Sequence, residues 1–553
     1  MLRFFFPRRR LPVVSLALLA ALVLVAGCGN RNRGGGGGTA NGSDGKVPGV
    51  LRYALTTEPT TLDPALVSDG PTIDLLMQVY EGLVGWNEKN EVVPLVARAM
   101  PTVSADGRTY TFVLRDNVKF TNGRAVTADD VKYSLTRSLD PKLNSSVAST
   151  YLNDIVGADA LAAGKATELT GVKVVDPKTV QITLVEPRAY FLGKLTYATG
   201  YVVAREEVEK GPLREGGAHS FDATNSVGTG PFKLASYAPQ SRVLLEANPD
   251  YWNGKPRLDR IERPIVLNAQ TRRNLYQSGK LDILTDLPKS DYLRDRDDPR
   301  MSPQIQQFDR AAVFYLGMNQ TQYAPFKDKR VRQAFNYAID KDSIIKTVHA
   351  GVTARANGVV PTGIPGHDPE FQGLPYDPER AKQLLAEAGY PEGKGLPPLA
   401  ITFRQQYPDY TKTCEVIQQQ LQAVGIQASL QEMEWSALLE ATNDSRVPCF
   451  LLRWSADYLD PQNFLSVLLH SKGPENRVGY SNPQYDALLD QADRGLDPAK
   501  RIAQYRAAER IVVDDAPWVP LYFQRDIELI KPHVKDMRDS LMGHLPHVTT
   551  RVE

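Results

Sequence analysis

One acidic residue stands among aromatic side chains late in the chain. Residues 453–464 read RWSADYLDPQNF, so Asp457 lies between Trp454 and Tyr458, just before an Asp-Pro turn. Aromatic rings exclude water, and a carboxylate beside them interacts more strongly with a charged partner than one in open solvent. The residues alone allow two interpretations: Asp457 caps the turn, or it contacts a ligand.

Motifs of enzyme active sites are missing from the sequence. It contains no G-x-S-x-G nucleophile elbow. Its GYPEGKG stretch (389–395) has one residue too few between the first two glycines for a phosphate-binding loop, and no Ser or Thr follows the lysine. His544 and His547 share an HLPH stretch without an HExxH motif or a cysteine cluster, so we expect a tail segment there. The sequence predicts a protein that is not an enzyme, with no metal and no cofactor.

Size and charge set further bounds on the molecule. The chain has 553 residues, 42% of them apolar and 23% charged, which predicts two or three lobes with ample cores. The formal net charge is +1, without the basic bias that nucleic-acid-binding proteins carry. We therefore expect no nucleic-acid partner.

The N-terminus has the features of a bacterial lipoprotein signal (1–27). A basic segment without acids precedes a short apolar run at 13–27, which ends at VAGC. Lipid would be attached to Cys28, and the Gly-rich residues 28–49 would form a flexible tether. An uncleaved anchor is the alternative, and it would also leave the body outside the cytoplasm. The sequence does not decide between general secretion and the twin-arginine route.

Two further cysteines, Cys414 and Cys449, complete the cysteine content. Export permits a disulfide between them. The chain lacks a framework of spaced cysteines, so two buried thiols are an equal alternative.

Short strands and helices alternate along the body of the chain. Residues 109–139 predict a strand, a turn and a helix, with Thr127 and Asp130 as a capping box. Residues 171–187 contain two β-branched runs around an Asp-Pro turn and predict a hairpin. A doubly wound arrangement is predicted from alternating helices and strands at 378–388, 399–406, 410–423 and 425–434. The fold class is therefore α/β with mixed sheets.

Segments spread from about residue 50 to 525 resemble one protein family, the extracytoplasmic solute-binding proteins of ABC importers. The resemblance is to family 5, the large class that binds oligopeptides, dipeptides and nickel. The matching segments are PTTLDPA (59–65), VYEGLV (79–84), 93–137, GTGPFKL (228–234), NPDYWNGKPRLDRI (248–261), 315–344, YDPERAKQLLAEAGY (376–390), RWSADYLDPQNF (453–464) and GYSNPQYDALLDQA (479–492).

This resemblance implies a periplasmic-binding-protein-like type II clamshell with an extra subdomain. Lobe I would comprise residues 50–265, including the subdomain, together with 519–553. Lobe II would comprise residues 266–518. Two crossings, near 263–269 and 517–523, would form the hinge.

The resemblance also implies a function. The protein would be a monomer, lipid-anchored at the extracytoplasmic face of the cell membrane, that captures peptides and delivers them to the permease of an ABC importer. Nickel complexes and oligosaccharides are rival ligands, and a sensor or an enzyme on the same clamshell is the rival class. The ATPase would be a separate cytoplasmic subunit. Ligand identity, peptide length and side-chain preference are not revealed by the sequence.

The resemblance assigns roles to residues at matching positions. Asp457 stands where peptide-binding members hold the α-ammonium of the ligand, and Trp454 and Tyr458 would wall a side-chain pocket. The residue before the tryptophan is often small in this family, so Arg453 would either narrow the cleft or meet a ligand carboxylate. Arg404, on the predicted strand at 399–406, is another candidate for that carboxylate. Glu58 would lie near the N-terminal end of the ligand. Surface roles are the alternative for Arg404, Arg453 and Glu58.

The signal generates a first testable prediction. A Cys28→Ser chain should lose its lipid and appear in the soluble fraction, because no other stretch of the sequence is long and apolar enough to anchor it. Membrane fractionation and mass spectrometry of the N-terminal peptide measure this. A Cys28→Ser chain that remains membrane-bound although its N-terminal peptide shows that the signal has been removed would exclude the lipid anchor.

Overall fold

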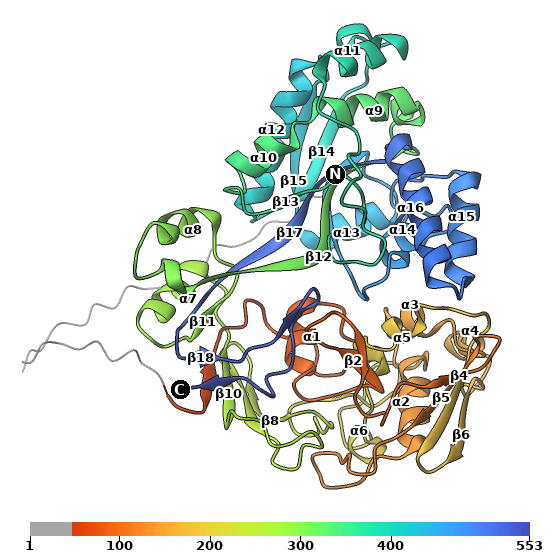
Figure 1. Cartoon of the computed structure of the whole chain (residues 1–553), viewed down its shortest axis with the longest axis vertical. Coiled ribbons are helices and arrows are strands. Elements are labelled where there is room, and N and C mark those ends of the chain that lie inside the picture. The colour runs from red at the N-terminus through yellow and green to blue at the C-terminus, as the bar shows by residue number, and fades with distance from the viewer. Residues whose placement is uncertain (1–46) are drawn as a thin grey trace, which may run out of the picture. The chain divides into compact units, whose positions relative to one another are not determined.

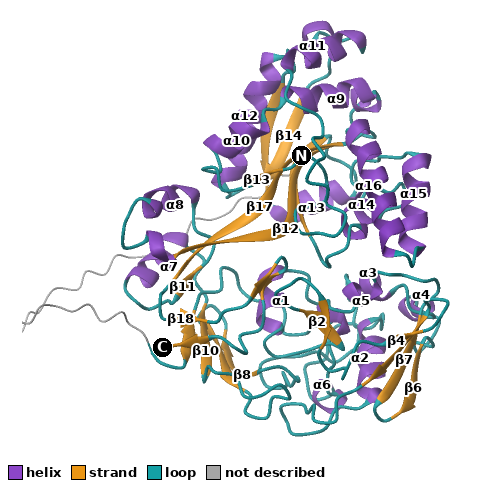
Figure 2. Cartoon of the chain, in the orientation of Figure 1, coloured by secondary structure: helices purple, strands orange, loops and turns teal. Residues whose placement is uncertain are grey.

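The computed structural model describes residues 47–553 and contains several sheets with helices packed around them (Figures 1 and 2). The predicted signal, the lipid-modified Cys28 and most of the predicted tether lie outside these residues. Across residues 47–553, every helix falls short of the length and apolarity that a membrane span requires.

The N-terminal part of the chain builds two four-stranded sheets. The first has the order β1-β10-β9-β8 and the second the order β4-β5-β7-β6. The strands are β1 (Val50–Arg52), β4 (Thr102–Val103), β5 (Thr109–Val113), β6 (Val172–Asp176), β7 (Thr179–Thr183), β8 (Phe232–Ala238), β9 (Arg242–Ala247) and β10 (Arg260–Pro264). One cluster of buried side chains, drawn mainly from residues 51–261, joins both sheets, and we call it the N-terminal core.

Local sequence signals place these elements correctly. Helix α2 (Ala128–Ser138) begins with the predicted capping box, in which the Thr127 N–H and the Asp130 carboxylate are 2.9 Å apart. The predicted hairpin at 171–187 is the antiparallel pair β6–β7. Both predictions are confirmed.

Strands from residue 283 to residue 530 build a larger sheet in the order β11-β17-β12-β16-β14-β15, with β13 paired to β17. These strands are β11 (Ile283–Leu284), β12 (Ile305–Met318), β13 (Ala354–Arg355), β14 (Leu399–Arg404), β15 (Ala428–Met433), β16 (Cys449–Ser455) and β17 (Trp518–Ile530). β14 and β15 are parallel, with α12 (Pro408–Ala423) between them in sequence and α11 (Pro378–Glu387) before them. The predicted alternation of helices and strands is therefore confirmed.

Two long strands dominate this sheet. β12 has 14 residues and β17 has 13, and Figure 1 shows them running side by side. Tyr315 of β12 stacks on Trp518 of β17 with ring centroids 3.5 Å apart. Buried residues on the two faces of the sheet form separate clusters, one containing Val313 and Phe523 and the other Phe314 and Tyr522.

The cysteine alternatives are resolved within this sheet. Cys414 lies in α12 and Cys449 begins β16, and both are buried as free thiols. Burial raises the pKa of both thiols, which keeps them protonated and unreactive. The disulfide alternative is not realised in this structure.

A buried ion pair in the PTTLDPA segment generates a stability prediction. Asp63 accepts hydrogen bonds from Arg137 and from the Ser220 hydroxyl, and both charged side chains are buried. Asp63→Ala leaves the Arg137 charge without its partner and should lower the free energy of unfolding by about 3–5 kcal/mol. Urea denaturation measures the change.

An exposed pair provides the control for this measurement. Lys132 and Glu168 form a salt bridge of 3.0 Å at the surface. Lys132→Ala should cost less than about 1 kcal/mol, because solvent screens such pairs. Equal losses in the two variants would contradict the role given to Asp63.

Candidate functional site

The Asp457 carboxylate lies in the loop between β16 and α14 (Gln462–Leu469), where Asn463 holds it. The Asn463 amide donates to Asp457 Oδ2 over 3.3 Å, and the Asn463 Oδ1 accepts from the Asp457 backbone N–H over 3.1 Å. The same oxygen accepts from Trp454 Nε1 over 2.9 Å. Because Asn463 is buried, it fixes the loop and the Trp454 ring in one network.

The turn that follows has its own acid. Asp460 Oδ1 accepts from the Gln462 backbone N–H over 3.0 Å and from Arg501 over 3.0 Å. Asp460 therefore caps this turn, which is the role that the sequence allowed for Asp457. The Asp457 carboxylate forms no ion pair with a cationic side chain within residues 47–553. It is left as an unneutralised anion.

The Asp457 side chain is half-buried and lies among aromatic side chains. Burial raises the pKa of its carboxyl to about 6, and hydrogen bonds from Asn463 and Tyr151 keep the pKa from rising further. Tyr151 belongs to the N-terminal core and stacks on Tyr197 with ring centroids 3.7 Å apart. A carboxylate in such surroundings gains more from a cation than a surface carboxylate does.

Trp454 and Tyr458, the two residues predicted to wall a side-chain pocket, differ in their exposure and in their contacts. Trp454 is half-buried and faces the carboxylate through Asn463. Tyr458 is buried, donates its hydroxyl to Gln462, and stacks on Tyr190 of the N-terminal core at 6.1 Å. Tyr458 is therefore a contact between this loop and the N-terminal core, while Trp454 keeps a surface that a ligand can reach.

The structure thus brings Asp457, Trp454 and Tyr458 together, and it adds two residues that sequence reasoning missed. Asn463 follows the Asp-Pro turn by two residues, and this spacing could have indicated a side chain that turns back to the loop. Nothing in the sequence near Tyr151 indicates that it meets a residue about 300 positions later.

Arg404 ends β14 and is held by aromatic rings. Its guanidinium carbon lies 4.4 Å from the ring centroid of Tyr407 and 4.8 Å from that of Trp435. The guanidinium has no carboxylate partner in the described part of the chain. Its N–H groups remain available for a ligand anion.

Arg453 lies in β16 on the opposite side of the sheet from Trp454. The cross-strand partner of Arg453 is Phe314, and that of Trp454 is Val313, so the two side chains point to different faces. Arg453 is exposed and donates to Gln524 Oε1 over 2.9 Å. It therefore does not narrow the space beside Trp454.

The edge of β16 near these residues has no protein strand beside it. β14 pairs with β16 only at Ile401–Cys449 and Thr402–Phe450, whereas β12 follows β16 as far as Ser455. Within residues 47–553 no strand pairs with that edge of β16 beyond Phe450. Its main-chain N–H and C=O groups are available to an extended ligand.

Glu58 has partners away from this loop. It accepts hydrogen bonds from the Tyr237 hydroxyl and, over 3.2 Å, from the Gln240 N–H at the turn between β8 and β9. No hydrogen bond or ion pair of the described residues joins Glu58 to Asp457. The contacts observed for Glu58 are those of a residue that fixes a turn.

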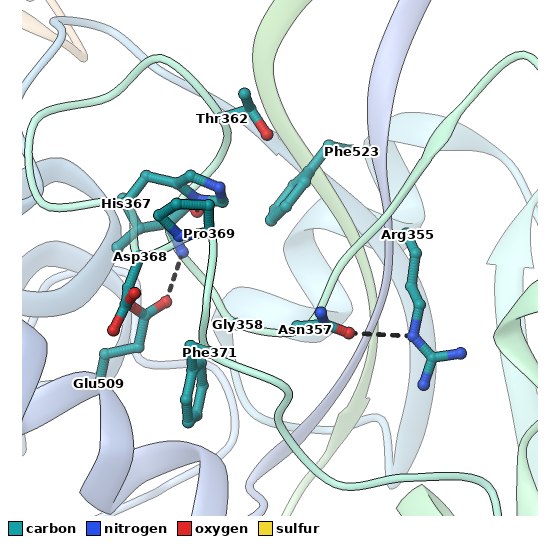
Figure 3. A pocket seen from close by; sticks show the side chains of 11 residues that line it. Arg355, Asn357, Gly358, Thr362, His367, Asp368, Pro369, Phe371, Glu509 and Phe523 are labelled. Carbon is teal, nitrogen blue, oxygen red and sulfur yellow. Dashed lines mark hydrogen bonds between the residues drawn. The ribbon is translucent and has the colours of Figure 1, made fainter.

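A pocket of about 250 Å³ lies beside the sheet, and Asp457 is not among the residues that line it (Figure 3). Phe523 and Phe371 turn their rings toward it, and Glu509 closes one side. Phe523 and Trp454 are both cross-strand partners of Val313, so they share one face of the sheet about 10 Å apart. The pocket can therefore extend the surface that Trp454 offers.

Candidate metal ligands are absent from the described residues. Residues 47–553 contain no group of three or more His, Cys, Asp or Glu that could hold a metal ion. His544 is instead paired with Glu528 over 2.9 Å, and His547 bonds to the Tyr53 hydroxyl over 2.9 Å. Both histidines fix the C-terminal segment.

Comparison with known proteins places this site in context. Residues 91–476 match the family described as bacterial extracellular solute-binding proteins, family 5 Middle. Heme-binding protein A of Haemophilus influenzae is 32% identical over 546 residues, which covers 96% of this chain and 97% of that protein. The oligopeptide-binding protein OppA of Bacillus subtilis is 30% identical over 532 residues, covering 94% of this chain and 95% of that protein.

A solved structure shows the same fold. The murein tripeptide binding protein MppA of Escherichia coli superposes with a TM-score of 0.77 at 29% identity, covering 91% of this chain and 98% of that chain. The predicted fold class, the type II periplasmic-binding-protein fold, is confirmed.

The Asn463 network generates a prediction about charge. Asn463→Ala removes a hydrogen bond that stabilises the ionised carboxylate, so the pKa of Asp457 should rise above about 6. A carboxyl ¹³C NMR titration measures the pKa, and the Asp457→Asn spectrum assigns the signal. Asn268→Ala, in the N-cap of a distant helix, serves as the control. A pKa that stays the same or falls would show that Asn463 does not support the charge.

Proposed function

Because the chain belongs to the bacterial extracellular solute-binding proteins of family 5, we propose that it captures short peptides and delivers them to the permease of an ABC importer. Its relatives include proteins named for binding oligopeptides, dipeptides and tripeptides. The observation that carries the proposal is the Asp457 carboxylate, an anion without a cationic partner beside an unpaired strand edge.

The carboxylate suits the ammonium group at the N-terminus of a peptide. Two opposite charges about 4 Å apart gain roughly 4 kcal/mol at an effective dielectric of 20, and desolvation takes part of this back. Trp454 supports the carboxylate by keeping water from one side. A neutral ligand would leave the negative charge of Asp457 without a neutralising partner.

The open edge of β16 suits the peptide backbone. A peptide lying there would pair by main-chain hydrogen bonds, which tolerate many side chains. Asp457 would hold its amino end, and Arg404, level with Leu452 by the β14 register, would receive its carboxylate. Asp457 lies five residues beyond Leu452, which is about 16 Å in extended chain, and this distance would limit the ligand to about five extended residues.

Delivery requires the two lobes to enclose the peptide. We place lobe I at 50–265 and 519–553 and lobe II at 266–518, with the hinge in the crossings near 263–269 and 517–523. A signal at 1–27, a lipid on Cys28 and the tether at 28–49 would hold a monomer at the outer face of the membrane. The protein performs no chemistry on its ligand in this role.

Heme is a second candidate ligand, because a relative covering 96% of this chain is named for binding it. Nickel complexes and oligosaccharides remain rivals by family membership alone. None of the three needs a carboxylate at position 457, and a sugar would favour neutral polar groups with stacking aromatics. Titration with hemin, followed by its Soret absorption, tests the heme alternative directly.

Asp457 provides the principal test. Asp457→Asn keeps the side-chain shape and removes the charge, so it should weaken the binding of Ala-based peptides by about 2–5 kcal/mol. Isothermal titration with di- to pentapeptides measures the affinity, and mass spectrometry confirms that no product forms. Asp460→Asn is an unsuitable control because Asp460 caps the turn, so the exposed Asp297→Asn is used. Unchanged affinity would show that the amine is held elsewhere.

The raised pKa of Asp457 predicts a pH dependence. Its carboxyl has a pKa of about 6, so the negative charge is present at pH 7 and is lost as the pH falls. The α-ammonium of the peptide stays charged over this range, so affinity should fall about tenfold from pH 7 to pH 5. Titrations at the two pH values measure this. The same fall in Asp457→Asn would assign the pH dependence to another group.

A further inference from the structure

Arg453 and Arg404 stand at one end of the open edge of β16, and neither has a carboxylate partner in the described chain. They approach this end from different directions. By its register with Leu452, Arg404 at the end of β14 projects onto the face of the sheet that carries Trp454. Arg453 projects from β16 onto the face that carries Phe314 and Tyr522.

Both guanidinium groups are held in place before any ligand arrives. Arg404 packs against the rings of Tyr407 and Trp435. Arg453 donates to Gln524, which in turn donates to Asp526 Oδ1 over 2.7 Å. A fixed guanidinium loses less entropy on binding a carboxylate than a free one does.

Carboxylates of the protein lie near Arg404 and Arg453, but these carboxylates interact more strongly with other cations. Asp526 Oδ2 accepts from Arg310 over 2.6 Å. Asp286 interacts more strongly with Arg272 than with Arg453, and Asp409 with Lys289. Among the described residues, none of these acids forms an ion pair with Arg404 or Arg453, so the charges of both arginines remain.

The strand register gives a ligand two different positions for a carboxylate, one beside Arg453 and one beside Arg404. In a ladder, residues directly opposite each other point to the same face. A peptide residue opposite Arg453 would therefore direct its side chain toward the Arg453 guanidinium, while its terminal carboxylate would continue toward Arg404. One carboxylate alone would leave one of the two guanidinium groups unneutralised.

We infer that this end of the site takes two carboxylates: the peptides bound best carry an acidic side chain on the residue opposite Arg453, at the carboxyl terminus. This rests on the proposed function, because the register assumes a peptide whose amino end lies at Asp457. The inference adds a side-chain preference to a site that otherwise recognises a peptide by its main-chain hydrogen bonds and its charged termini.

The test compares Ala-Ala-Ala-Glu with Ala-Ala-Ala-Gln by isothermal titration, since these peptides differ in one charge and have nearly the same shape. The wild-type protein should bind the Glu peptide about tenfold more tightly. Arg453→Gln should reduce this ratio to about one. Arg453→Lys, which keeps the charge, should retain part of the preference. Arg446→Gln, an exposed residue close before β16, should leave the ratio unchanged.

Each outcome decides between the claims. Equal affinities of the wild type for the two peptides would overturn the acidic preference while peptide binding stands. Tighter binding of Ala-Ala-Ala-Lys would also overturn it, and would show that Asp286 and Asp409 govern this end. No binding of any peptide would overturn the proposed function and this inference together. A preference that persists in folded Arg453→Gln would exclude Arg453 as its source.

Discussion

The candidate site depends on one constraint: β16 loses its neighbour β14 before β16 itself ends. A backbone edge without a partner is costly inside a protein unless water or a ligand bonds to it. Here the edge lies between a strand end that presents Arg404 and a loop that presents Asp457. The sheet order therefore creates both a surface for a backbone and the distance between the charged groups at its two ends.

The charges along this edge follow a simple pattern. The anion at Asp457 has hydrogen bonds but no cation, and the cations at Arg404 and Arg453 have rings or an amide but no anion. Charged groups held in this way keep a fixed orientation without neutralising one another. A zwitterionic peptide with its amine toward the Asp457 loop would place a charge of opposite sign at each end of the edge. The reversed peptide would place like charges together. Under the proposed function, the electrostatics would thus select a direction as well as a class of ligand.

Much of this was predictable because it is local. The Thr127 capping box and the hairpin at 171–187 depend on residues within about ten positions of one another, and each of the alternating elements around α12 follows from the pattern of its own residues. Asp457 was proposed as a ligand contact through the family motif that contains it, and that role stays a prediction. Its supports were harder to find, since Tyr151 reaches the loop from a different core. The face of Arg453 follows from its register with Phe314, which no spacing within β16 reveals.

The hydrogen bond between Asp457 and Tyr151 bears on how binding could be linked to closure. Asp457 belongs to the loop after β16, whereas Tyr151 belongs to the N-terminal core, and Tyr458 stacks on Tyr190 of that same core. A carboxylate has enough lone pairs to accept from Asn463, Tyr151 and a ligand amine together. An amine bound there would therefore stabilise the ionised form of Asp457, to which Tyr151 already donates a hydrogen bond. In this arrangement the residue proposed to hold the ligand amine is also one of the residues through which the two parts of the chain meet, so under the proposed function binding and enclosure would favour each other.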